Sequence, residues 1–234
     1  MINGIKIEIC IGNLNDALIA SKYPIDRIEL NCALELGGLS PSLETLKAVK
    51  DKISTPVCTM VRPRGGDFIY NDIEFETMLK DAKNFLEAGS DGIVFGFTTK
   101  DLNIDIKRTK EMVELIHSYN KEAVFHKAFD VINDQEKGIK ELIDLKIDRI
   151  LTSGKADYSN ILEGCQRINN LHKKYGEKIQ LLPGGGVRIH NIKDVVNTCD
   201  THQVHMTSKK ENPGGYLELD TDQLEKLLKE LQTI

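Results

Sequence analysis

Two arginines flank a proline in the segment 62–66 (RPRGG), the densest chemical signal in the chain. Pro63 fixes its own φ angle and disfavours helix at the preceding residue, so this segment is stiff. Guanidinium groups on a stiff segment suit bidentate binding of a carboxylate or a phosphate. We therefore take Arg62 and Arg64 as candidate anion-binding residues. A tight turn with solvated arginines is the alternative.

A glycine triplet, Gly184, Gly185 and Gly186, precedes a run of residues with helical period. Consecutive glycines let backbone N–H groups approach an anion closely. Ser208 lies at the end of the following strand-like run, where the next loop begins, and offers a hydroxyl donor. These residues predict an anion site, with a phosphate as the expected ligand. A plain strand-to-helix turn is the alternative interpretation.

The segment 125–130 (FHKAFD) carries a histidine and an aspartate four positions apart. If the strand continues to the end of this segment, the two side chains share a parity, which means that they point to the same face of the strand. On that condition Asp130 orients or charges the imidazole of His126, a pairing typical of general acid–base catalysis. Lys127 has the opposite parity and is expected to face the helices. This orientation disfavours a Schiff-base role, which needs an amine inside the pocket.

Cys10 and Cys32 stand at the ends of the first two strand-like runs. Two thiolates are sufficient ligands for Cu(I), a soft ion. However, strand parity points Cys10 inward and Cys32 outward, and a buried cysteine is commonly just a small hydrophobic residue. Both interpretations stay open. The five cysteines, at scattered positions, indicate a reduced, cytoplasmic protein without a disulfide framework.

Strand-like and helix-like runs alternate along the chain, eight of each. The strand-like runs cover residues 6–11, 27–32, 56–63, 92–97, 123–130, 149–153, 180–186 and 203–208. The helical runs cover residues 15–22, 43–53, 74–89, 104–119, 135–147, 159–175, 191–198 and 221–232. Ser42, Asp134 and Asp220 stand where N-caps are expected.

Strict alternation predicts parallel strands joined by right-handed crossovers, so the fold class is α/β. A doubly wound sheet with a bound dinucleotide would need a glycine-rich turn after the first strand, and the segment 11–14 (IGNL) lacks that pattern. Eight units fit a closed (βα)8 TIM barrel. We expect one such domain over residues 1–234.

Polar residues in the predicted strands fall on one parity. Isoleucines at positions 5, 7, 9 and 11 alternate with Lys6, Glu8 and Cys10, so the isoleucines are expected to face the helices and Glu8 the barrel interior. Glu29, Arg62 and His205 point inward by the same reasoning. These groups then converge on the carboxyl-terminal rim, where barrel enzymes carry their active sites. The alternative is an internal ion-pair network among Glu8, Glu29, Arg62 and Arg64.

The formal net charge of −5 argues against sequence-independent binding of nucleic acid, which needs an excess of Lys and Arg. No apolar run approaches the roughly 18 residues of a membrane span. The first residues, MINGIKIEIC, lack the features of a signal peptide. We therefore expect a cytoplasmic protein without nucleic-acid or membrane partners.

In its motifs the chain resembles the CutC family. The matching blocks are RIELNCALELGGLSPS (27–42), VRPRGGDFIYND (61–72), SDGIVFGF (90–97), FHKAFD (125–130), RILTSG (149–154) and PGGGVR (183–188). The resemblance implies a (βα)8 barrel, a cytoplasmic homodimer or homotetramer, a role in copper homeostasis, and Cu(I) binding at Cys10 and Cys32. Lys127, Lys155 and the run VHMTSKK (204–210) depart from the family's usual pattern.

Two functions of different classes follow. The first is copper homeostasis with Cu(I) as ligand, and it depends mainly on the resemblance. The second is an isomerase, lyase or aldolase acting on a small phosphorylated or carboxylated metabolite, without an organic cofactor. In that enzyme Glu8, Glu29, His126, Asp130 and His205 are the candidate catalytic residues. A barrel without catalytic activity that serves as an oligomeric scaffold is a third, weaker hypothesis.

Overall fold

The computed structural model describes residues 1–155, 157 and 160–234, and its centre is a sheet of parallel strands. These strands are β1 (Lys6–Ile11), β2 (Arg27–Leu30), β3 (Val57–Met60), β4 (Gly92–Phe95), β5 (Glu122–Phe125), β6 (Arg149–Thr152), β7 (Gln180–Pro183) and β8 (Gln203–Met206). Hydrogen bonds join them in the order β7-β6-β5-β4-β3-β2-β1-β8. The Gln203 side chain donates to the Leu181 carbonyl (3.1 Å) and links the two edges. The predicted (βα)8 barrel is therefore confirmed.

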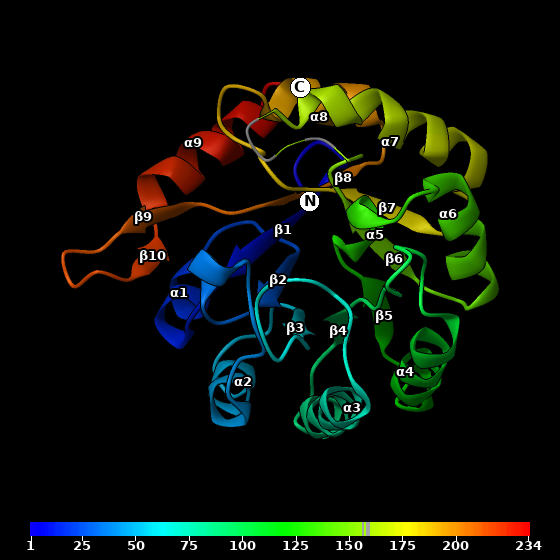
Figure 1. The fold of residues 1–234 in the computed structure, drawn as a ribbon. Helices are drawn as coiled ribbons and strands as arrows, with labels where there is room; N and C mark the ends of the chain where they lie inside the picture. Colours follow the sequence, from blue (N-terminus) through cyan, green and yellow to red (C-terminus); the bar gives the residue numbers. More distant parts are fainter. Residues whose placement is uncertain (156, 158–159) are drawn as a thin grey trace.

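Helices surround the strands on the outside (Figure 1). They are α1 (Leu14–Ala20), α2 (Leu43–Lys50), α3 (Asp72–Glu87), α4 (Ile106–Ser118), α5 (Ala128–Val131), α6 (Gln135–Asp144), α7 (Leu162–Tyr175), α8 (Ile192–Cys199) and α9 (Thr221–Leu231), with a short 3-10 turn η1 (Leu34–Leu36). The predicted N-caps Ser42, Asp134 and Asp220 each accept a backbone N–H of the first turn. The expected start of the sixth helical run, at Ser159, lies outside the described residues.

Two segments differ from the predicted pattern. The fifth strand ends at Phe125, and the chain turns directly into α5. After β8 an antiparallel hairpin of β9 (Lys209–Glu211) and β10 (Leu217–Leu219) projects from the barrel (Figure 1). The expected strand runs 123–130 and 203–208 are therefore too long, and the observed strands also end before the expected runs 27–32, 56–63, 92–97, 149–153 and 180–186 do. After β5 and β8 the chain leaves the sheet, so strand parity no longer decides where a side chain points.

The core has two parts that follow the alternation along the strands. Ile7, Ile9 and Ile11 are buried between the sheet and the helices in the larger apolar cluster. Cys58, Met60, Val94 and Val124 form a small separate cluster of strand residues. Glu8 is also buried and faces the barrel interior as predicted, where it pairs with Arg27 and His205 of the neighbouring strands. In the described part of the chain, no helix is both long enough and apolar enough to span a bilayer.

Candidate functional site

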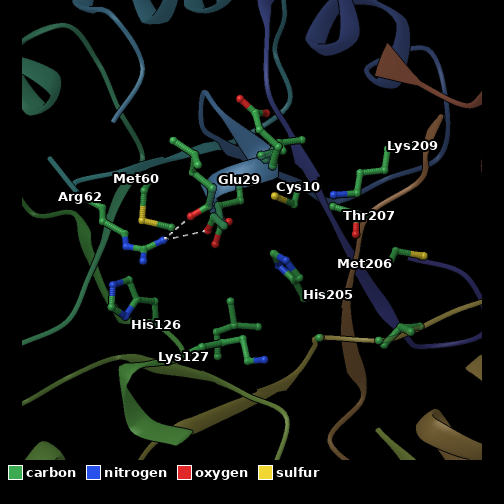
Figure 2. A pocket seen from close by; sticks show the side chains of 18 of the residues that line it. Cys10, Glu29, Met60, Arg62, His126, Lys127, His205, Met206, Thr207 and Lys209 are labelled. Carbon is green, nitrogen blue, oxygen red and sulfur yellow. Dashed lines mark hydrogen bonds between the residues drawn. The ribbon is translucent and has the colours of Figure 1, made fainter. Parts of the chain in front are cut away.

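A cavity of about 600 Å³ opens at the carboxyl-terminal ends of the strands (Figure 2). It brings together seven of the residues singled out from the sequence: Cys10, Glu29, Arg62, His126, Gly185, Gly186 and His205. Within the described part of the chain, the others lie outside the lining: Glu8, Cys32, Arg64, Asp130, Gly184 and Ser208. The cavity therefore combines acidic, basic, thiol and imidazole groups from strands that are distant in sequence.

Glu8 lies beneath the cavity and holds His205. Its carboxylate accepts a hydrogen bond from Nδ1 of His205 (2.7 Å) and forms an ion pair with Nε of Arg27. Burial acts to raise the pKa of Glu8, but the charges of Arg27 and His205 outweigh it and lower this pKa well below its ordinary value. Glu8 is therefore an ionised group that positions His205. The sequence analysis expected Glu8 to line the cavity, but it lies outside the lining.

Cys10, Glu29 and His205 place one ligand-type atom each within 4.8 Å of one another. Figure 2 shows their side chains side by side at the base of the cavity. Asn31 donates its Nδ2 hydrogens to Sγ of Cys10 (3.4 Å) and to Oε1 of Glu29 (3.0 Å). The amide therefore fixes the thiol and the carboxyl relative to each other.

Burial and mutual charge decide the protonation of this cluster. Burial raises the pKa of Glu29, and burial together with the Glu29 carboxyl raises the pKa of the Cys10 thiol. For His205, burial acts to lower the pKa, but the carboxyl groups of Glu29 and Glu8 outweigh it and raise this pKa. The raised pKa values favour the protonated forms of all three groups, so a bound cation competes with protons for their donor atoms.

His126 lies on another wall of the cavity. The sequence predicted that it pairs with Asp130, but the two side chains have different partners. Nδ1 of His126 accepts the backbone N–H of Ala128 (3.1 Å), whereas Asp130 accepts from the hydroxyl and amide of Ser153 at 3.0 and 2.8 Å. The strand ends before Asp130, so the parity that joined the two residues does not apply. The predicted pairing is wrong for this reason.

Lys127 lines the cavity, contrary to the prediction that it faces the helices (Figure 2). It follows the end of β5 and forms the N-cap position of α5, where the chain has already turned. Its Nζ lies 3.9 Å from Oδ2 of Asp130. The amine is therefore one of the basic groups at the mouth.

The two arginines of the predicted anion clamp point to different places. Arg62 is buried and lines the cavity, where its guanidinium donates to backbone carbonyl oxygens. Arg64 forms ion pairs with Glu74 (2.6 Å) and Asp67 (3.2 Å) away from the cavity. The alternative interpretation, an ion-pair network among Glu8, Glu29 and the two arginines, is therefore not found among the described residues, where Glu8 pairs with Arg27 and His205.

The glycine loop lines the opposite side of the cavity through Gly185 and Gly186, whose φ values are 93° and 92°. Gly184 lies below, where an added Cβ would be 2.6 Å from Leu151 and 2.9 Å from His205. The hydroxyl of Ser208 donates to the carbonyl of Asp220 (2.6 Å) and is thereby tied to the base of the hairpin. Only part of the predicted anion site therefore faces the cavity.

The second candidate copper ligand, Cys32, is turned away. Its Sγ donates to the carbonyl of Ser40 (3.0 Å), and its backbone pairs with Leu39. Sequence reasoning also missed two residues that line the cavity, Phe68 in the loop after β3 and Lys209 at the start of β9. Both occur close to singled-out motifs, but a loop and a three-residue strand have no periodicity that could reveal the direction of a side chain.

The family model of CutC matches residues 5–210. The chain belongs to the CutC family. A CutC relative from Treponema denticola is 43% identical over 220 residues, which are 91% of this chain and 88% of the relative. The human relative, named copper homeostasis protein cutC homolog, is 34% identical over 213 residues, 91% of this chain and 77% of its own.

Solved structures agree with this assignment. The putative copper homeostasis protein CutC from Streptococcus agalactiae has a TM-score of 0.79 at 34% identity and covers 86% of this chain and 97% of its own. A phosphoribosyl anthranilate isomerase reaches a TM-score of 0.60 at 15% identity, covering 98% of this chain and all of its own. That second likeness shows only that the barrel fold is shared.

Proposed function

We propose that this CutC family member acts in copper homeostasis and binds Cu(I) in the barrel cavity through Cys10 and His205, with Glu29 beside them. The observation that carries the proposal is the cluster of three donor atoms within 4.8 Å. A thiolate and an imidazole are suitable ligands for a soft monovalent copper ion. The relatives named for copper homeostasis support the same function.

Glu8 prepares His205 for this role. Because the Glu8 carboxylate holds Nδ1, the other ring nitrogen, Nε2, is available to a cation. Carboxylate–histidine pairs of this kind orient the ring and strengthen it as a metal ligand. Cu(I) must displace the protons of Cys10 and His205, so the apparent affinity rises about tenfold per pH unit for each proton released.

A competition titration tests the proposal. Cu(I) is added anaerobically to the wild type and to three variants in the presence of bathocuproine disulfonate. Cys10→Ser and His205→Phe are expected to lose the tight site, whereas Cys32→Ser, the matched control for a thiol outside the cavity, keeps it. Unchanged stoichiometry in Cys10→Ser, or loss of the site in Cys32→Ser alone, contradicts the proposal.

A second candidate is an enzyme of the isomerase, lyase or aldolase type acting on a small phosphorylated or carboxylated metabolite. The favouring observation is the loop of Gly185, Gly186 and Val187, whose backbone N–H groups have no hydrogen-bond partner among the described residues. Arg188 and Lys209 line the same cavity. Amides and cations in this arrangement suit a phosphate group.

Titration with inorganic phosphate, followed by phosphorus NMR, tests this candidate. Lys209→Gln is expected to weaken phosphate binding, whereas Lys210→Gln is the matched control because Lys210 pairs with Glu218 on the exposed hairpin. Equal binding by both variants contradicts the phosphate site.

The cellular location and assembly are proposed from the family resemblance. We expect a cytoplasmic homodimer or homotetramer, in a reducing compartment that keeps Cys10 a thiol. Light scattering after gel filtration measures the assembly. A monomer at all concentrations contradicts it.

A further inference from the structure

His126 lines the cavity and has a buried ring nitrogen without a hydrogen-bond partner among the described residues. The residue is 4% exposed, and this nitrogen is its Nε2. Gly96 provides the space for the ring, since an added Cβ there would lie 2.5 Å from two ring atoms. A buried polar atom without a partner is costly, so a structure that keeps one in a cavity wall favours a ligand as the partner.

The protonation of His126 decides which kind of ligand atom fits. Nδ1 accepts the N–H of Ala128, so the neutral ring carries its proton on Nε2. Burial, and then the charge of Arg62, lower the pKa of His126 to about 3. The ring is therefore a fixed neutral donor at physiological pH, and the ligand atom that it meets must be an acceptor.

Arg62, 7% exposed, adds an uncompensated positive charge to the same wall. Its Nη1 donates to the carbonyl oxygens of Leu36, Gly37 and Gly38 at 3.2–3.3 Å, and its Nη2 donates to that of Gly66 at 2.9 Å. In residues 1–155, 157 and 160–234, no carboxylate oxygen lies within 4.0 Å of this guanidinium. A buried charge with neutral partners alone favours an anion as ligand.

Phe68 holds the two groups together. Its ring centroid lies 4.7 Å from that of His126 and 5.1 Å from Cζ of Arg62. Figure 2 shows Arg62 and His126 side by side on the wall across from Cys10. This wall is thus separate from the donor cluster of Cys10, Glu29 and His205, although both face one cavity.

We propose that His126 and Arg62 form a binding site for the carboxylate group of a small organic molecule. One carboxylate oxygen accepts the Nε2–H of His126, and the negative charge compensates the guanidinium of Arg62. The inference deepens the second candidate function and rests on it, because it names the carboxylate as one end of the ligand. The glycine loop across the cavity then suits a second anionic group on the same molecule.

NMR of the imidazole N–H signals tests this site, with pyruvate as the probe. Millimolar pyruvate is expected to shift the Nε2–H signal of His126 in the wild type. His126→Phe and Arg62→Gln should each bind pyruvate about tenfold to a hundredfold more weakly, as expected for a lost hydrogen bond to a charged group. His117→Phe, at the other end of the barrel, is the matched control and keeps wild-type affinity.

Two results overturn the proposal. One is a wild-type His126 signal that does not respond to pyruvate; the other is pyruvate affinity unchanged in both His126→Phe and Arg62→Gln. Thermal unfolding shows whether each variant is folded, and Arg62→Lys, which keeps the charge, is expected to recover part of the affinity.

The other proposals fail by different readouts. Cu(I) binding in His126→Phe is expected to stay at wild-type stoichiometry, so copper binding and carboxylate binding are lost separately. Inorganic phosphate should shift the amide signals of Gly185 and Gly186. If phosphate does not shift these two amide signals, the phosphate site alone is rejected. The response of the His126 signal to pyruvate tests the carboxylate site separately.

Discussion

Burial of a neutral His126 makes the stability of the protein dependent on pH, and the size of this effect can be calculated. The pKa of His126 is about 3 in the native state, against 6.5 for the free side chain. Between these values the unfolded chain binds a proton that the native chain does not, so stability falls as pH falls below 6.5. From pH 7 to pH 5 this one residue should remove about 2 kcal/mol from the free energy of unfolding.

Urea unfolding of the wild type and His126→Phe at both pH values measures this contribution. Because the chain lacks tryptophan, circular dichroism or tyrosine fluorescence is the suitable signal. Other titrating groups act equally on both proteins, so the loss of stability between pH 7 and pH 5 should be about 2 kcal/mol smaller in the variant. Equal losses in both proteins, or an NMR titration of His126 with a midpoint near 6, would refute the reasoning.

The buried pairs and the glycine loop give two further predictions. Glu8→Gln leaves Arg27 and His205 without their carboxylate and should destabilise the fold by about 3–5 kcal/mol, whereas Glu44→Gln, which breaks an exposed pair with Lys47, should cost less than about 1 kcal/mol. Similar costs in urea unfolding would contradict the role of Glu8. Gly184→Ala forces a Cβ to within 2.6 Å of Leu151 and should cost about 1–3 kcal/mol, whereas Gly65→Ala, with its nearest neighbour at 3.7 Å, should cost less. If Gly65→Ala is the more destabilising in thermal unfolding, the packing argument fails.

The inner half of the site could be predicted from the sequence because strands have a strict period of two. Glu8, Glu29 and His205 lie within β1, β2 and β8, and their inward orientation followed from the apolar residues that alternate with them. The same period placed Cys10 inside and Cys32 outside. A barrel then brings such residues together, although they are far apart in sequence.

The outer half could be predicted only in part, because its residues follow strand ends. Arg62, His126 and the glycines 185 and 186 line the cavity as expected, whereas other residues point elsewhere. Lys127 and Asp130 belong to the turn and helix after β5, so extending the strand gave each the wrong direction. Arg64 is drawn outward by Glu74, which belongs to the capping box of α3, a pairing that appears only when the helix is placed. Hydrogen bonds and ion pairs, which have no sequence period, decide these positions.

The hairpin from Lys209 to Leu219 had no place in a pattern of alternating strands and helices. Its strands are three residues each and are joined by a turn around Gly215. It nevertheless brings Lys209 to the cavity. Short insertions of this kind are invisible to an argument from long periodic runs.

X-ray absorption at the copper edge of the Cu(I)-loaded protein tests the copper site most directly. The proposed site predicts one sulfur scatterer, from Cys10, with nitrogen or oxygen from His205 and Glu29, and the spectrum of Cys32→Ser should be the same. Two sulfur scatterers in the wild type that become one in Cys32→Ser would contradict it.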